Sequence, residues 1–139
     1  RKGGPRILVG GNGGKRTMAT VVRHAAEWNC VALHPKEFVR LNTKLDKMLA
    51  EAGRHPESVR RSMMTECFFA REDAVLKKKL SARKRTLEEL HQRGAIAGSG
   101  SQVKEQLREL ERVGLQRIML QWLDLDDLAG LEALAKEVV

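Results

Sequence analysis

A cluster of glycines is the part of the sequence whose residue types and spacing point most directly to chemistry. Four of five consecutive positions are glycine: Gly10, Gly11, Gly13 and Gly14, with Asn12 between them. Glycine lets backbone N–H groups approach an anion closely, and the amino terminus of a following helix adds partial positive charge. Lys15 and Arg16 come next. The cluster therefore predicts a phosphate-binding loop, and a tight structural turn is the alternative.

The loop matches neither of the two common nucleotide-binding patterns. The nucleoside-triphosphate loop G-x-x-x-x-G-K-[ST] requires glycine at Val9 and a hydroxyl residue at Arg16. The dinucleotide pattern G-x-G-x-x-G that starts at Gly11 also requires glycine at Arg16. We therefore expect phosphate binding of another kind.

Other residues that often carry chemistry are better explained by structure. The histidines and cysteines lack metal-ligand spacing, so no metal site is predicted. Asp124, Asp126 and Asp127 precede a predicted helix, where acidic side chains complement the helix dipole. Ser99 and Ser101 have no nearby base, so neither is proposed as a nucleophile. No catalytic residue is assigned.

The elements that position the loop are strands alternating with helices. Glycine and proline boundaries and the spacing of apolar residues predict strands near 7–9, 28–33, 62–70 and 117–123. Helices are predicted from 15 onward, over 35–52, over 72–93, from an N-cap at Ser101, and from about 128 to the carboxyl end. Such an order predicts an α/β fold with a parallel sheet, because parallel neighbours need long crossovers.

The net charge raises the question of nucleic-acid binding. The 139 residues include 26 Lys plus Arg against 18 Asp plus Glu, a formal charge of +8. The densest basic stretch, 77–85, lies in the predicted helix 72–93. However, only 4% of residues are aromatic, so base stacking has little to work with. We favour a solvated helix face, with a non-catalytic basic binding module as the alternative function.

The sequence offers no run of about 20 apolar residues that would cross a bilayer. The two cysteines, Cys30 and Cys67, are too few for a disulfide framework and are typical of small buried residues in a reducing compartment. The expected location is therefore the cytoplasm, without a membrane partner.

Four segments of the chain resemble the luciferase-like flavin and deazaflavin (F420) oxidoreductases. Residues 7–17 resemble that family's phosphate-loop segment, and Glu27-Trp28-Asn29 is similar to the end of its A-D-x-W-N segment. Met64-Thr65 is similar to the next strand, and Leu120-Gln121 to the closing strand. In order and spacing these segments cover nearly the whole chain.

The resemblance implies the carboxyl-terminal half of a (β/α)8 TIM barrel, with residues 1–139 as a partial domain of about four strand and helix units. It also implies an F420- or FMN-dependent enzyme that acts on a small molecule by hydride transfer or monooxygenation. The cofactor phosphate would be held by Gly10, Gly11, Asn12, Gly13, Gly14, Lys15 and Arg16.

The chain departs from the family pattern at two positions and in one segment that bear on activity; the segment is 97–101, A-G-S-G-S, where the family usually has V-G-T-P-E. Ala26 stands where the family commonly has Asp, and Glu66 where it commonly has Gly. A carboxylate at Glu66 either obstructs the pocket or reaches solvent.

A half-barrel also implies a partner. Four parallel strands leave open edges and an uncovered face, on which several of Val31, Leu33, Phe68, Ile118 and Leu120 would lose cover. The expected partner is a copy of the chain or the missing amino-terminal half, and we expect a dimer or larger species when the chain is alone.

Overall fold

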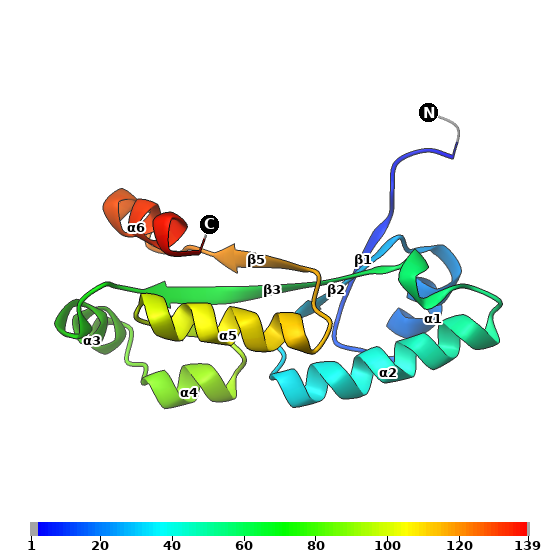
Figure 1. Cartoon of the computed structure of the whole chain (residues 1–139), viewed down its shortest axis with the longest axis horizontal. Coiled ribbons are helices and arrows are strands. Elements are labelled where there is room, and N and C mark those ends of the chain that lie inside the picture. The colour runs from blue at the N-terminus through cyan, green and yellow to red at the C-terminus, as the bar shows by residue number, and fades with distance from the viewer. Residues whose placement is uncertain (1–2, 139) are drawn as a thin grey trace.

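Parallel strands and covering helices form the architecture of the computed structural model, which describes residues 3–138 (Figure 1). The strands are β1 (Leu8–Gly10), β2 (Glu27–Val31), β3 (Arg60–Phe69), β4 (Ile96–Gly98) and β5 (Arg117–Gln121). The helices are α1 (Lys15–His24), α2 (Pro35–Glu51), α3 (Asp73–Ala82), α4 (Leu87–Gln92), α5 (Gly100–Arg112) and α6 (Leu128–Val138), with a short 3-10 turn at Pro56–Ser58. The α/β fold with a parallel sheet is as predicted.

The long strand β3 organises the sheet. Its residues 60–64 pair with β2, residues 62–66 pair with β5, and residues 67–69 pair with β4, all in parallel. The strand β1 pairs with β2 in turn. Because every strand runs the same way, the loops that follow β1, β2, β3 and β5 leave from one edge of the sheet, the carboxyl edge.

Three predicted boundaries were wrong, each for a local reason. The segment 95–101 was expected to be a loop, but it contains β4, which makes five strands instead of four. The helix predicted over 72–93 is broken by Lys84, whose φ is +51°, into α3 and α4. The N-cap of α5 is Ser99 instead of Ser101, because Ser99 forms a capping box with Gln102.

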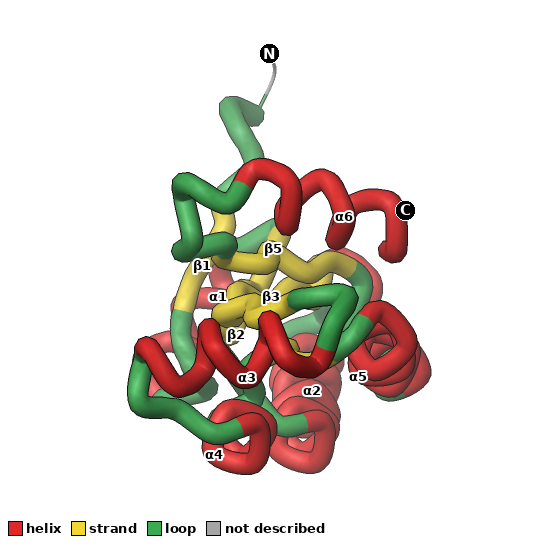
Figure 2. The backbone as a smooth tube through the Cα atoms, turned by 90° about the vertical axis from the view of Figure 1, so that its left-hand side faces the viewer, coloured by secondary structure: helices red, strands yellow, loops and turns green. Residues whose placement is uncertain are grey.

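One face of the sheet carries the main core, and we call it the helix face. Alternate strand residues point to the same side, and Trp28, Cys30 and Met63 lie there fully buried. Trp28 stacks on Phe38 of α2, with ring centroids 6.0 Å apart. Figure 2 shows α2, α4 and α5 below and beside the strands, and α6 above them. This packing holds α2 directly behind the loop that follows β1.

The opposite side, which we call the open face, is defined by the other set of alternating residues. The strand register aligns its members in rows: Leu8, Glu27 and Arg60; Gly10, Asn29, Ser62 and Arg117; Val31, Met64 and Met119; Glu66 and Gln121. Leu8 and Val31 are 47% and 40% exposed. Apolar surface on this side therefore remains in contact with solvent.

Fewer apolar strand residues are exposed in the structure than the half-barrel interpretation predicted. We expected several of five apolar strand residues to lose cover; of these, Val31 is exposed, whereas Leu33 and Phe68 are buried. Ile118 and Leu120 are half-buried because they lie on the helix face and pack against the main core. Phe68 packs in a second cluster with residues of α3 and α4.

Candidate functional site

The predicted phosphate loop lies at the carboxyl edge of the sheet. Residues 11–14 join the end of β1 to the start of α1, as strand and helix spacing predicted. In parallel α/β folds this edge is where ligands bind, because the loops there are free to vary while the strands hold them in place. The loop therefore lies at the edge of the sheet where binding sites of such folds are found.

Hydrogen bonds to β2 fix the shape of the first half of the loop. The Gly11 N–H donates to the carbonyl of Asn29 at 2.9 Å, and Trp28 Nε1 donates to the carbonyl of Gly11 at 2.8 Å. The Asn12 side chain donates to the Val31 carbonyl at 2.8 Å and accepts from the Val31 N–H at 2.7 Å. The side chain of Asn12 is therefore occupied in anchoring the loop to β2.

Gly13 has a structural role of its own. Its φ is +78°, and a Cβ atom there would lie 2.5 Å from Leu41 Cδ2 on α2. Leu41 is buried in the main core. A larger residue at position 13 would disturb packing whether or not a ligand is bound, so this position cannot separate binding from folding.

The second half of the loop presents unused hydrogen-bond donors. Gly14 is the N-cap of α1 and provides no side-chain cap, and the first helical bond runs from the Met18 N–H to the Gly14 carbonyl. Within residues 3–138, the N–H groups of Lys15, Arg16 and Thr17 have no hydrogen-bond partner. These three donors point out of the first turn of α1, where the helix dipole also favours an anion.

Two cations flank these donors. The Lys15 and Arg16 side chains are exposed, and neither forms an ion pair with any residue that the structure describes. No acidic side chain occupies the first turn of α1. The charge and the free donors together make this end of α1 suited to a phosphate group.

A separate charged cluster lies at the carboxyl ends of β3 and β5. Lys79 of α3 forms a close ion pair with Asp127, lies 3.5 Å from Asp124 and donates to the Phe69 carbonyl at 3.3 Å. Its ammonium group also lies 5.0 Å from the centre of the Trp122 ring. The hydrogen bond from Lys79 and that from the Gly130 N–H hold the pKa of Asp127 below its ordinary value.

This cluster explains the acidic segment 124–127 and changes the interpretation of the basic stretch 77–85. Asp127 accepts the Gly130 N–H at 2.8 Å in the first turn of α6, as expected of an acidic residue at a helix start. Lys79, however, is mostly buried: its side chain is only 20% exposed and pairs with Asp127 at the start of α6. The basic stretch is therefore interrupted both by the turn at Lys84 and by this ion pair.

The cysteines and the other candidate metal ligands form no reactive or metal-binding group among the described residues. Burial raises the pKa of the Cys30 and Cys67 thiols to about 12, so both remain protonated near neutral pH. Among the described residues no group of three His, Cys, Asp or Glu side chains is placed to hold a metal ion. In the same range, no helix is both long and apolar enough to span a bilayer.

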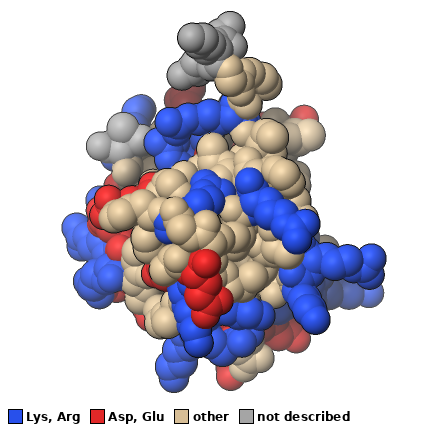
Figure 3. Space-filling view, turned by 90° about the vertical axis from the view of Figure 1, so that its right-hand side faces the viewer, with Lys and Arg blue, Asp and Glu red and all other residues tan. Residues whose placement is uncertain are grey.

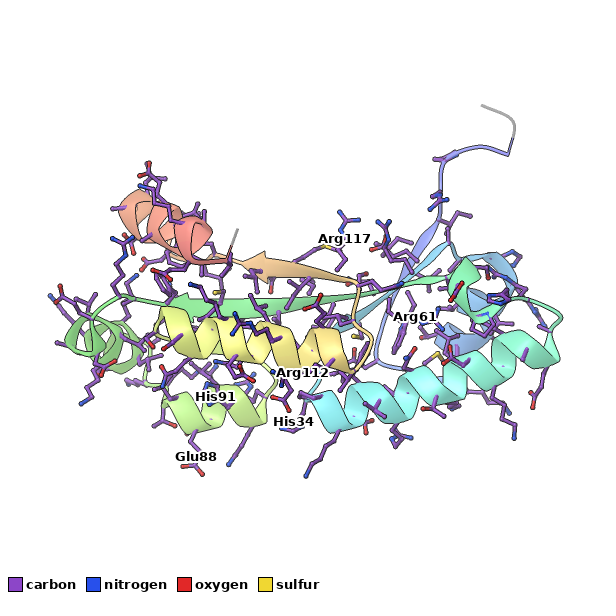
Figure 4. The ribbon with its side chains drawn as sticks, in the orientation of Figure 1. His34, Arg61, Glu88, His91, Arg112 and Arg117 are labelled. Carbon is purple, nitrogen blue, oxygen red and sulfur yellow. The ribbon has the colours of Figure 1, made fainter. Side chains whose placement is uncertain are left out.

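Arg61 is an important residue that sequence reasoning missed. It is 5% exposed on the helix face, where it donates to Asn42 Oδ1 at 2.8 Å and to the Pro56 carbonyl at 2.6 Å, and pairs with Asp46. Figure 4 shows it on the α2 side of β3, opposite to Arg117. Its place between two apolar residues of the same alternating set, Val59 and Met63, was a usable signal.

Comparison with known proteins identifies the fold. No protein-family model matches the sequence, and no curated protein matches it. The chain is similar in structure to riboflavin lyase, solved with modified FMN and riboflavin (TM-score 0.74, 15% identity), which it matches over 98% of its own length and 42% of that chain.

Two further solved structures give the same result. One is the oxygenating component of 3,6-diketocamphane monooxygenase from Pseudomonas putida, in complex with FMN (TM-score 0.71, 18% identity, 96% of this chain and 48% of that one). The other is an F420-dependent secondary alcohol dehydrogenase with an F420–acetone adduct (TM-score 0.69, 10% identity, 98% of this chain and 49% of that one).

The likeness confirms the expected resemblance in fold to the TIM-barrel, luciferase-like oxidoreductases. The chain spans less than half the length of each of these structures.

Proposed function

We propose that this chain is the carboxyl-terminal half of a luciferase-like barrel oxidoreductase, and that it binds the phosphate of FMN or F420 at the amino terminus of α1. The observation that carries the proposal is the free first turn of α1 at the carboxyl edge of the sheet, with Lys15 and Arg16 beside it. The solved structures of the same fold include complexes with FMN and with F420.

The residues present fit a phosphate group. The N–H groups of Lys15, Arg16 and Thr17 are oriented to donate to phosphate oxygens, and Gly14 leaves the approach to them clear of a side chain. Lys15 and Arg16 supply compensating charge. Gly10, Gly11, Asn12 and Gly13 contribute indirectly, because their contacts with β2 and α2 set the direction in which α1 begins.

The chemistry of the complete protein would come from the cofactor ring, which transfers hydride or activates oxygen. The chain's own part would be to hold the phosphate end of the cofactor at the first turn of α1. Ring and substrate contacts, and the catalytic residues, belong largely to the other half of the barrel. We accordingly treat residues 1–139 as a partial domain with a small-molecule substrate, located in the cytoplasm.

Replacing Gly14 with aspartate tests the phosphate site. Gly14 has a φ of −57° and no close neighbour, so it accepts a side chain, and aspartate is a favoured N-cap residue. Gly14→Asp should leave the free energy of unfolding unchanged or raise it by a few tenths of a kcal/mol. The new carboxylate should occupy the free N–H groups and repel phosphate, so calorimetry should show FMN and F420 binding weakened by about tenfold or more.

The matched control is Gln92→Glu, which adds the same charge on α4, away from the loop. This control should bind FMN and F420 as the unchanged chain does.

Lys15→Ala/Arg16→Ala should weaken binding without removing it. Equal cofactor affinity in Gly14→Asp and the unchanged chain would show that the phosphate lies elsewhere.

A further inference from the structure

A basic pocket lies on the open face, at the end of the sheet opposite to the glycine loop. It has a volume of about 330 Å³ and is lined by the first residues of β1, β2, β3 and β5 and the segment before β1: Arg6, Ile7, Leu8, Ala26, Glu27, Arg60 and Arg117. Figure 3 shows the molecule from this end, where Lys and Arg side chains are spread around the surface with fewer acidic ones between them.

The charges in this pocket are unbalanced. Three arginines face one glutamate, so the net charge is 3 − 1 = +2. Arg117 Nη1 lies 3.4 Å from Glu27 Oε2, and Figure 4 shows Arg117 on the side of the sheet away from Arg61. Arg6 and Arg60 are exposed and pair with no acidic residue in the described part of the chain. Two guanidinium groups therefore remain without a counter-charge.

Closing a barrel would bury this pocket. The interior of an eight-stranded barrel is filled by layers of side chains from alternate strands, and all strands begin at the same end. The open face supplies one half of those layers, so the amino-terminal strand ends of the second half would lie opposite Arg60 and Arg117. A guanidinium that is buried without a partner is strongly unfavourable.

A second copy of this chain is a poor occupant for the same reason. A parallel barrel made from two copies has its twofold axis along the barrel, which brings the same end of both copies together. Two pockets of +2 would then face each other with a combined charge of +4. Like charges placed opposite one another across an interface disfavour that pairing.

We propose that the basic pocket receives carboxylates from a second half-barrel that is not a copy of this chain. The inward-facing side chains at the amino-terminal strand ends of that half carry Asp or Glu, which pair with Arg6 and Arg60. The inference rests on the half-barrel in the proposed function, and it selects between the two partners that the sequence left open. It applies whether the second half comes from the same polypeptide or from another.

A charge-reversed form of this chain serves as the acidic half-barrel in the test. Arg6→Glu/Arg60→Glu changes the pocket from +2 to 1 − 3 = −2, and both positions are exposed, so the fold should be kept. Sedimentation velocity and native mass spectrometry should show mixed dimers of this variant with the unchanged chain, at least about tenfold more stable than either homodimer. The preference should shrink near 1 M salt, where the Debye length is about 3 Å.

The control is Lys77→Glu/Lys78→Glu, which makes the same change in net charge on the exposed side of α3. It should form no excess of mixed dimers with the unchanged chain. The proposal is overturned if the control pairs equally well, if the unchanged chain dimerises as tightly as the mixture, or if the mixture forms no dimer. Circular dichroism establishes that each variant is folded. Because no cofactor is present, these results are independent of the phosphate-site test.

Discussion

At the scale of single residues, Arg61 shows how one buried charge connects three segments. Its guanidinium links β3 to Asn42 and Asp46 of α2 and to the carbonyls of Pro56 and Val59. Burial lowers the pKa of Arg61, and the nearby Asp46 acts in the opposite direction. The planar group offers five donors in one fixed geometry, which a lysine could not reproduce.

Arg61→Met should lower the free energy of unfolding by about 2–3 kcal/mol, because it leaves Asp46 and several carbonyls without their donor. Arg61→Lys should recover only part of that loss. The adjacent Arg60→Met is the control: Arg60 is exposed, and its replacement should change stability by less than about 0.5 kcal/mol. Urea unfolding of the three variants measures the difference, and equal effects at positions 60 and 61 would contradict this role.

At the scale of elements, the turn between α3 and α4 depends on a local capping signal. The Thr86 hydroxyl accepts the Glu89 N–H at 3.1 Å, and the Glu89 carboxylate accepts the Thr86 N–H at 2.9 Å. This reciprocal pair starts a new helix at Leu87, even though the spacing of Leu80, Leu87 and Leu90 continues the apolar pattern on both sides of residues 83–86. The capping box thus outweighs the continuous periodicity.

Thr86→Ala should therefore lower stability by about 1 kcal/mol, the usual cost of losing an N-cap. Thr43→Ala, at an exposed position inside α2, is the matched control and should be neutral or slightly stabilising, because alanine is the better helix former. Thermal unfolding distinguishes the two. A neutral result at position 86 would mean that packing alone holds α4 in place.

The ion pair between Lys79 and Asp127 links α3 to α6 and makes stability depend on pH. The pKa of Asp127 is lower in the folded chain than its ordinary value near 3.9, so the folded state binds this proton less readily than the unfolded state. The contribution is complete above about pH 5, begins to decrease as the pH approaches the ordinary pKa near 3.9, and is lost as the pH falls through the lowered pKa.

Asp127→Asn should cost about 0.5–1 kcal/mol at pH 7, allowing for the partial exposure of both side chains. The difference from the unchanged chain should narrow in acid below about pH 4. Denaturant unfolding at pH 7, 4 and 3 measures this. A constant difference at all three values would show that the mutation acts through the α6 cap and not through charge.

At the scale of the whole molecule, the distribution of positive charge bears on the alternative function as a basic binding module. The helix break at Lys84 and the engagement of Lys79 divide the basic segment 77–85, which leaves no continuous stripe of free cations along one helix. The remaining cations are spread over separate surfaces, including the pocket at the amino-terminal end of the sheet. This arrangement favours diffuse attraction over a shaped nucleic-acid interface.

Binding to DNA or RNA should therefore be weak, without sequence preference, and strongly reduced between about 50 and 200 mM salt. Fluorescence anisotropy with several unrelated duplexes and single strands measures this. A sequence-specific complex that persists at about 200 mM salt would instead support the basic binding module.

Local patterns were sufficient to predict much of the fold. Glycines 10–14 between a short apolar run and a helical pattern identified the β1–α1 loop, and Pro35 and Gly53 bounded α2 to within about two residues. These features depend on neighbours along the chain, since backbone freedom, capping and amphipathic spacing act over a few residues. The phosphate site was predicted from the same local pattern, and it stays a prediction.

Features that depend on contacts between distant segments could be seen only in the tertiary structure. The short strand β4 exists because residues 96–98 pair with the end of β3, and Gly13 is required because Leu41 packs against it. Arg6, Arg60 and Arg117, separated by up to 111 residues (117 − 6), meet in one pocket through strand order and register. Sequence spacing predicts which way a side chain points within its own strand, but pairing between strands decides which charges become neighbours.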